Sequence, residues 1–341
     1  DITMAADLIE EVARIYGYDK IPSTLPEMSM TVGKRSDVQA KKHMIRNLLK
    51  DQGLHETLTY SLTSPTLVED FNIFHTNETI KLAMPLGEER SVTRKSIISS
   101  LLQVINYNQS HNIKDVNVFE LSTTYSKNTE LQNLAIACCG EYNGLAFKQI
   151  SYKADYYLMK GFVETIFKNL GVEESRYKLV RVDQNDTNYH PGRSAYIMIG
   201  KEIVGVIGNI HPLMEKKYNV KDVYVVELNL TTLLNLKTSK VKFVDIPMYP
   251  SVSRDIALVM DKDVATYDVC RKIIQASKQL VKETKIFDVY EGEHIGANKK
   301  SVAINLIFQD LKGTLEENTI NAVMEKILES VSKEFDAVLR A

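Results

Sequence analysis

Four acidic side chains near the start of the chain have the spacing most suggestive of chemistry. Asp7, Glu10 and Glu11 lie at i, i+3 and i+4, and Asp1 could reach them from the preceding turn. On a helix these carboxylates would converge, and because like charges repel, a hard cation such as Mg²⁺ would stabilise the group. The alternative is an acidic first turn that complements the helix dipole, with Glu10 paired to Arg14. Acidic first turns are common, so the spacing alone favours the alternative.

The histidines give little support for catalysis. His190 and His211 each precede a proline, in sequences typical of turns, and a single histidine is more often structural than catalytic. Arg193 follows the first of these turns. A magnesium-dependent phosphoryl-transfer enzyme built on the four acids would need a phosphate-cradling loop or a nearby base, and the sequence offers neither. We therefore assign no catalytic residue.

Basic residues in the last third of the chain are candidates for RNA binding. They are Arg254, Arg271, Lys272, Lys278, Lys282 and Lys285. Acids of the same region balance their charge, so a solvated surface explains them equally well. The strand-like segment 300–308 lacks spaced aromatic residues, so base stacking on a sheet is not predicted. Upstream, Glu89, Arg90 and Arg94 form either an interface cluster or a solvated loop.

Composition limits the class of protein. The 341 residues, 44% of them hydrophobic, suffice for two or three domains. The 42 basic and 44 acidic residues leave a net charge of −2, so any contact with RNA must be local. Two of the three cysteines are adjacent in the apolar run LAIACCG, which indicates neither a disulfide nor a zinc site. Without a membrane-length apolar stretch or a signal sequence, we expect no membrane partner and a cytoplasmic location. Because the chain starts at Asp1 without a methionine, we expect a piece of a longer protein.

Hydrophobic periodicity predicts alternating helices and strands up to Leu230. The predicted helices are 7–16, 37–52 (between Ser36 and Gly53), 96–109 and 155–171, and the predicted strands are 55–62, 116–122, 133–140, 177–182, 194–199, 202–210 and 223–230. We expect an antiparallel sheet with helices packed on it.

A different pattern begins at Pro247. The predicted order is strand 253–260, helix 264–278, strands 284–290 and 301–309, helix 316–333 and a short strand near Val338. Thr314 is the predicted cap of the last helix. This βαββαβ order is typical of a ferredoxin-like fold.

Four strings give the chain a family resemblance. DLIEEVARIYGYDKIP, YHPGRSA, YPSVSRDIAL and FDVYEGE resemble the C-terminal part of bacterial phenylalanyl-tRNA synthetase β subunits. The resemblance implies an α+β fold with three regions. Residues 1–25 would end the domain named B5, 26–246 would form a class II synthetase-like module, and 247–341 a ferredoxin-like anticodon-binding domain.

The resemblance also implies roles for particular residues. In the family four acids bind a magnesium ion shared with the α subunit. The matching positions here are Asp1, Asp7, Glu10 and Glu11. The middle module is implied to be catalytic-like but inactive, and the residues agree: an active class II site needs an arginine two positions before the strand glutamate, and Val118 stands there before Glu120.

By this resemblance the intact enzyme joins phenylalanine to its tRNA with ATP, as an (αβ)₂ heterotetramer whose α subunit holds the active site. The present chain would scaffold α, share magnesium with it and bind tRNA, while the editing domains would lie outside this sequence. Two alternatives stay open: the phosphoryl-transfer enzyme above and a stand-alone RNA- or protein-binding module.

Overall fold

The chain folds into two compact units in a computed structural model, residues Asp1–Val241 and Lys242–Ala341, and each is described by itself. The structure describes residues 2–30, 32–238, 243, 245–278, 280–292, 295–296, 298–311 and 313–340, without the side chains of 144–146. In that part of the chain, no helix is long and apolar enough to cross a membrane. The predicted boundaries after residues 25 and 246 stay predictions.

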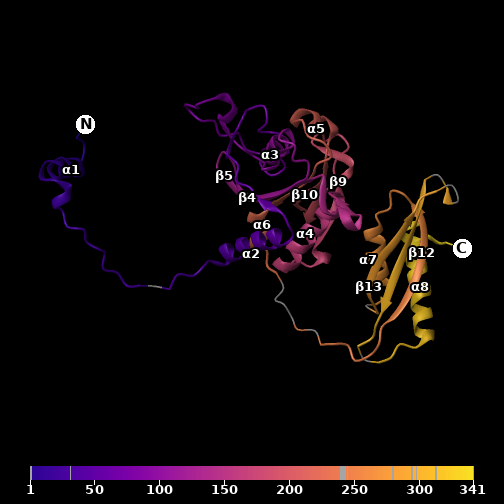
Figure 1. Ribbon diagram of the computed structural model, residues 1–341. Coiled ribbons are helices and arrows are strands. Elements are labelled where there is room, and N and C mark those ends of the chain that lie inside the picture. Colours follow the sequence, from indigo (N-terminus) through magenta and orange to yellow (C-terminus); the bar gives the residue numbers. More distant parts are fainter. Residues whose placement is uncertain are drawn as a thin grey trace. The chain divides into compact units, whose positions relative to one another are not determined.

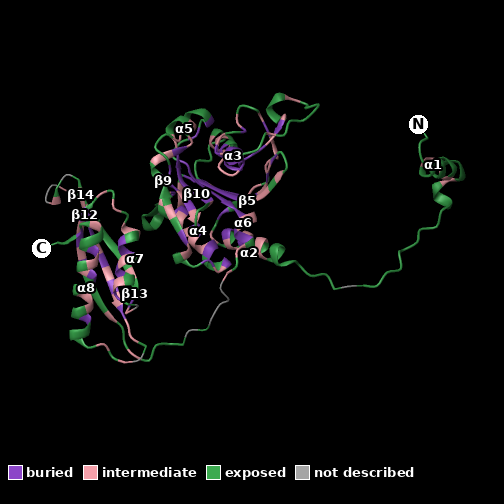
Figure 2. Ribbon diagram, turned by 180° about the vertical axis from the view of Figure 1, so that it is seen from behind, coloured by how far each residue is buried: buried purple, intermediate pink, exposed green. Residues whose placement is uncertain are grey.

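The first helix, α1 (Ala5–Tyr16), exposes its apolar side chains. None of its residues is buried, and Val12 and Ile15 are 68% and 79% exposed. Most of the helix is green in Figure 2, the colour of exposed residues. After η1 (Tyr18–Lys20), the described residues of 21–36 have no regular secondary structure. The next helix, α2 (Asp37–Asp51), is capped by Ser36, as predicted. The Ser36 hydroxyl accepts a hydrogen bond from the Gln39 amide.

A seven-stranded sheet forms the centre of the first unit, in the order β1-β4-β5-β11-β10-β9-β8 (Figure 1). Its strands are β1 (His55–Glu56), β4 (Val116–Ser126), β5 (Thr129–Cys139), β8 (Tyr177–Arg181), β9 (Tyr189–Ile199), β10 (Glu202–Ile210) and β11 (Tyr224–Asn229). All neighbours are antiparallel except β1, which pairs with β4 in parallel at the edge. The expected antiparallel sheet is therefore present with one parallel edge.

Helices cover both faces of this sheet. α2, α4 (Tyr156–Leu170) and α6 (Leu230–Asn235) share one apolar core with it, and α3 (Ile98–Ser110) and α5 (Pro212–Tyr218) share the other. Asp155 caps α4 through the Leu158 amide, and Gly171 ends it with φ of +75°, a conformation that favours glycine. The closing glycine was predicted.

Several short elements were not predicted. The expected strand 55–62 is two strands, β1 and β2 (Leu62–Thr63), and β2 pairs with β3 (Val92–Thr93). The hairpin of β6 (Glu141–Leu145) and β7 (Ile150–Lys153) and the helices α5 and α6 were missed. The short helices η2 (Glu88–Arg90), η3 (Ala146–Lys148) and η4 (Glu174–Arg176) complete this unit. Elements this short carry too few residues for a periodic signal.

The second unit has the predicted ferredoxin-like order. Its elements are β12 (Val252–Asp261), α7 (Thr266–Ala276), β13 (Val281–Tyr290), β14 (Lys299–Phe308), α8 (Glu317–Phe335) and β15 (Val338–Leu339). The sheet order is β13-β14-β12-β15, and both helices share a core with one of its faces. The predicted cap of α8 was wrong: Glu316 precedes the helix, and no side-chain cap forms there.

Candidate functional site

Asp7 closes the start of α1. Its Oδ2 accepts hydrogen bonds from the backbone amides of Thr3 (2.7 Å) and Met4 (2.9 Å). These two bonds lower the pKa of the Asp7 carboxyl, and the bond from Thr3 has the larger effect. The carboxyl therefore stays ionised. The side chain therefore already serves as a helix cap through one of its two oxygens.

The predicted metal ligands that the structure describes do not form a group around Asp7. Glu11 pairs with Arg14 at 2.6 Å, whereas the alternative interpretation had expected Glu10 in that pair. Asp1 lies outside the described residues. Among the residues that are described, no group of three or more metal-binding side chains forms. Carboxylates are suitable donors for Mg²⁺, but these three do not make a site by themselves, and the metal site stays a prediction.

Arg94 is buried at the centre of the first unit, in neither of the two environments expected for it. Its side chain is fully buried, and its Nη2 donates to Glu120 Oε1 at 2.7 Å. Thr59 donates to the second oxygen of Glu120 at 2.5 Å and accepts from Arg94 Nη1 at 2.6 Å. A buried ion pair is tolerated only when its charges are hydrogen-bonded in this way.

A second buried carboxylate lies near the start of α3. Glu227 accepts from the Ser96 hydroxyl (2.6 Å), the Ile97 amide (3.0 Å) and the Asn133 side chain (3.2 Å). Burial nevertheless raises its pKa to about 7, because desolvation outweighs these bonds. Glu120 and Glu227 both align with Ala135 of the strand between them, so the two carboxylates belong to one face of the sheet.

These buried groups are hydrogen-bonded to one another or to the backbone. Val118, which stands where an active class II site needs arginine, is 5% exposed in the core. His190 and His211 accept hydrogen bonds through Nδ1 from the amides two residues ahead, each at 3.1 Å. His190 lies within β9 and His211 caps the start of α5, so neither histidine lies in the turn that the sequence predicted.

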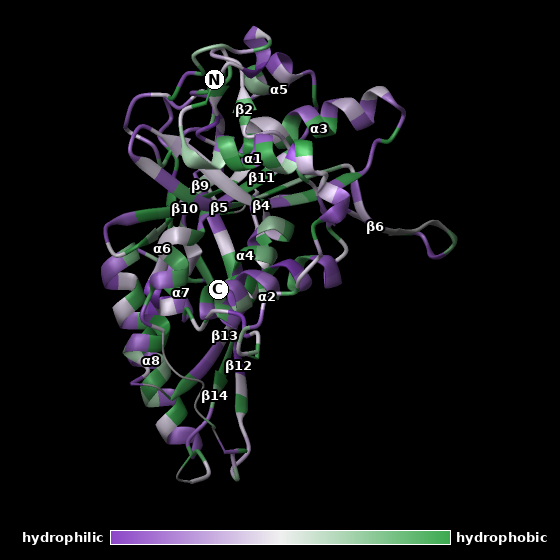
Figure 3. Ribbon diagram, turned by 90° about the vertical axis from the view of Figure 1, so that its left-hand side faces the viewer, coloured by the Kyte–Doolittle hydropathy of each residue, from purple (hydrophilic) through white to green (hydrophobic). Residues whose placement is uncertain are grey.

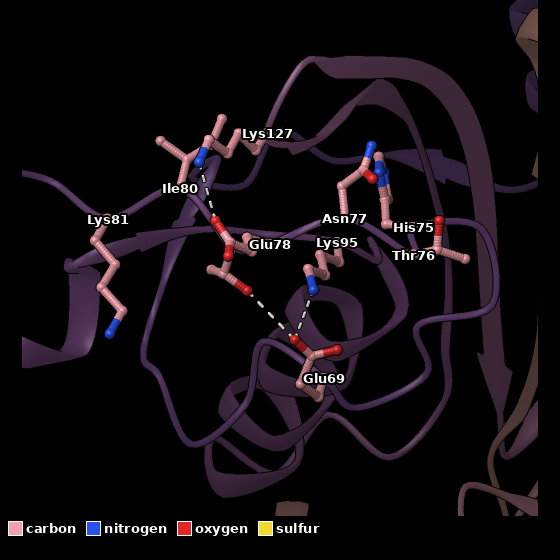
Figure 4. A pocket seen from close by; sticks show the side chains of 10 residues that line it. Glu69, His75, Thr76, Asn77, Glu78, Ile80, Lys81, Lys95 and Lys127 are labelled. Carbon is pink, nitrogen blue, oxygen red and sulfur yellow. Dashed lines mark hydrogen bonds and ion pairs between the residues drawn. The ribbon is translucent and has the colours of Figure 1, made fainter.

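A surface hollow of about 940 Å³ lies beside the β4–β5 turn. It is lined by Glu69, His75, Thr76, Asn77, Glu78, Thr79, Ile80, Lys81, Lys95 and Lys127. Figure 4 shows Lys95 directed at Glu69 and Lys127 at Glu78, with separations of 2.6 and 3.1 Å. Both ring nitrogens of His75 are hydrogen-bonded to hydroxyl groups, and burial lowers the pKa of His75 to about 4. Since most of its charges are paired, we assign no ligand to this hollow.

The predicted RNA-binding residues lie on several surfaces of the second unit. Arg271 lies over the Tyr267 ring at 5.9 Å, Lys272 pairs with Glu334, and Arg254 lies 3.8 Å from Glu317. Lys278, Lys282 and Lys285 are exposed. Strand register aligns Lys285 with Asn305 and Asp255. The adjacent row, Ile286, Ile304 and Ile256, contributes Ile304 and Ile256 to the core under the helices, so the Lys285 row belongs to the opposite, helix-free face.

The same helix-free face carries an aromatic–cation pair that the sequence analysis missed. Tyr290, at the end of β13, aligns with Ser301 and Val259, and the Arg340 guanidinium lies 5.2 Å from its ring centre. The small residues Ala257 and Ala303 occupy the neighbouring row. The prediction that no base stacks on the sheet rested on segment 300–308 alone, whereas Tyr290 lies on the strand paired with it. An aromatic residue on the paired strand and an arginine near the C-terminus are the features of the sequence that point to this pair.

Comparisons with known proteins agree with this architecture. Residues 21–230 match the family model of the phenylalanyl tRNA synthetase beta chain CLM domain, and residues 247–340 that of the ferredoxin-fold anticodon binding domain. The two matches define a subunit of an aminoacyl-tRNA synthetase. The chain belongs to the phenylalanyl-tRNA synthetase β chain family, as the sequence motifs predicted, and the predicted α+β fold class is confirmed.

Two curated relatives are phenylalanine–tRNA ligase beta subunits. The chain is 39% identical to the phenylalanine–tRNA ligase beta subunit of Geobacillus kaustophilus and 38% identical to that of Bacillus subtilis; it is matched over its whole length and spans 42% of each relative. Among solved structures, a pyrrolysyl-tRNA synthetase of Desulfitobacterium hafniense is similar with a TM-score of 0.44 and 14% identity, over 57% of this chain and 66% of that one.

Proposed function

We propose that this chain is the non-catalytic scaffold and tRNA-binding part of a phenylalanine–tRNA ligase β subunit. The α subunit of the (αβ)₂ enzyme would hold the active site, where phenylalanine is joined to tRNA-Phe with ATP. The observation that carries the tRNA-binding role is the helix-free face of the second unit, with Tyr290 and Arg340 beside small residues. An aromatic ring next to a guanidinium suits an unpaired base and its phosphate.

The buried charges of the first unit support the non-catalytic role. Both oxygens of Glu120 are occupied by Arg94 and Thr59, so this carboxylate is not free to bind a nucleotide. Glu227 is likewise enclosed by hydrogen bonds and fully buried. Because the oxygens of both carboxylates already accept hydrogen bonds within the fold, a structural role in a scaffold is consistent with them.

The assembly is tested by coexpressing this chain with a bacterial phenylalanyl-tRNA synthetase α subunit. Stoichiometric copurification and aminoacylation of tRNA-Phe are expected. An intact, RNA-binding chain that does not retain α would instead support the stand-alone module.

The RNA contact is tested by Tyr290→Ala. Loss of one stacked base should weaken tRNA binding by about 1–3 kcal/mol, whereas Tyr290→Phe keeps the ring and should bind nearly as well as the parent. Equal tRNA affinities of Tyr290→Ala and Tyr290→Phe would contradict a stacking role.

The shared magnesium is a further part of the proposal. Asp1, Asp7, Glu10 and Glu11 would supply carboxylates to an ion that is completed by water or by the α subunit, because Mg²⁺ retains waters and needs few protein ligands. Asp7→Asn separates this role from the helix cap, since its amide oxygen can still accept from the Thr3 and Met4 amides. Chelation should weaken association of α with the parent but not with Asp7→Asn. An equal response of both proteins would count against the site.

A further inference from the structure

The β6–β7 hairpin and the start of α4 present aromatic side chains to solvent beside lysines. Phe147, Tyr152 and Tyr157 are 80%, 44% and 74% exposed. Lys148 and Lys153 each directly follow one of these aromatic residues in the sequence. Figure 3 shows the hairpin projecting from the body of the first unit. We call Phe147, Lys148, Tyr152, Lys153 and Tyr157 the hairpin surface.

Two of these rings are supported from behind. Tyr152 meets Tyr142 edge to face, with ring centres 6.4 Å apart, and Tyr142 meets Phe162 in the same way at 5.7 Å. The Tyr142 hydroxyl donates to the carbonyl of Gln52, which ties the hairpin to the end of α2. Tyr157 likewise meets Tyr156 edge to face at 5.7 Å. A ring that is already held in place loses little conformational freedom when a ligand stacks on it.

The lysines of the hairpin surface are available for contacts. Lys148 Nζ lies 5.7 Å from the Phe147 ring, and neither Lys148 nor Lys153 forms an ion pair in the described part of the chain. Glu141 aligns with Lys153 in the strand pairing. The next acid along the chain, Asp155, is occupied as the cap of α4.

We propose that the hairpin surface binds unpaired nucleotides of tRNA, with bases stacked on Phe147, Tyr152 or Tyr157 and phosphates near Lys148 and Lys153. Alternating rings and ammonium groups match the alternating bases and phosphates of a single strand. Protein interfaces are enriched in aromatic residues but depleted in lysine, so it is the lysines beside the rings that favour RNA over a protein partner. The inference rests on the proposed tRNA-binding function but concerns a surface in the other unit from Tyr290.

The experiment uses the complex of this chain with the α subunit. Its binding to a tRNA-Phe transcript is measured by fluorescence anisotropy at several salt concentrations. Phe147→Ala should raise Kd roughly five- to hundredfold, the range for loss of one stacked base. Lys148→Ala should lower the salt dependence of log K by about 0.7, the value for one phosphate of a single strand. Tyr107→Ala and Lys178→Ala are the controls: Tyr107 is 65% exposed on α3, and Lys178 is exposed on β8.

The outcomes separate this inference from the function on which it rests. A parent complex that does not bind tRNA would overturn both, whereas parent binding with hairpin variants equal to the controls would overturn only the hairpin surface. Hairpin variants that bind tRNA normally but lose the α subunit would overturn it in favour of a protein contact. If the hairpin surface does bind tRNA, a transcript without its unpaired 3′ end shows which nucleotides it contacts. The effect of Phe147→Ala on binding disappears with this transcript if the 3′ end is bound, and it persists if a loop is bound.

Discussion

The two units of the chain place their charges in opposite ways. The first unit buries Arg94, Glu120 and Glu227 completely or nearly so among its strands. In the described residues of the second unit, the buried polar side chains are Ser277 and Ser301, and neither is charged. Among its described lysines and arginines, Lys272 pairs with the exposed Glu334, and the partly buried Lys300 donates to the carbonyls of Lys262 and Val264.

The difference separates structural charges from binding charges. A buried ion pair stabilises only when every partner is present, so changes to the buried charges of the first unit should act on stability. Surface charges are screened by water and salt, so changes in the second unit should act on RNA binding and leave stability nearly unchanged. Substitutions of single residues can test whether this difference between the two units holds.

The largest effect is expected for Arg94→Met, because it leaves Glu120 buried without its charged partner. Breaking such a pair costs about 3–5 kcal/mol of stability. The measurement is hydrogen exchange of β4 and β5 amides, which follows this unit separately from the other. As a control, Arg94→Met with Glu120→Gln removes the buried charge and should recover part of the loss. Unchanged exchange in the single variant would show that the pair is not needed for stability.

Glu227→Gln should change how stability depends on pH. Burial raises the pKa of Glu227 from 4.5 to about 7, so between these values the folded chain binds a proton that the unfolded chain releases. Stability from this group therefore falls as the pH rises from about 4.5 to about 7, by on the order of 3 kcal/mol.

The neutral Glu227→Gln variant should lack that fall, so its difference from the parent should grow across the same pH window. His75 acts in the opposite direction, since its pKa is lowered from 6.5 to about 4 and stability from it is lost on acidification. His75 is common to both proteins and cancels in the comparison. Hydrogen exchange of β11 at several pH values checks the prediction, and parallel curves would contradict it.

Much of the fold could be predicted because long elements repeat one pattern. The strands β10 and β11, the second half of β9, the helix α4 with its closing Gly171, and the whole order of the second unit follow from periodicity and caps. The β6–β7 hairpin could not be predicted in the same way, since its two strands have only five and four residues. Cross-strand support such as the Tyr142 contact is visible only in three dimensions.

The candidate sites were less accessible to sequence reasoning. Arg94 was grouped with Glu89 and Arg90 because they are close in sequence, but its partner Glu120 lies 26 positions away. Tyr290 and Arg340 are separated by 50 positions in the chain and meet only when the sheet forms. The acids of α1 show that local spacing alone is also insufficient. Asp7, Glu10 and Glu11 lie on a helix as predicted, yet their carboxylates do not form a group that could hold a metal ion.

The smallest effect on stability is expected for Lys272→Gln, which removes the surface pair with Glu334. The two side chains are 31% and 49% exposed, so solvent screens the pair and its loss should cost at most about 1 kcal/mol. If Lys272 also contacts a phosphate, the salt dependence of tRNA binding should fall by about one unit, because one fewer counterion is released. Lys326→Gln on α8 is a control with another exposed lysine. A large loss of stability with unaltered tRNA binding would reverse the contrast between the two units, because a charge of the second unit would then be structural.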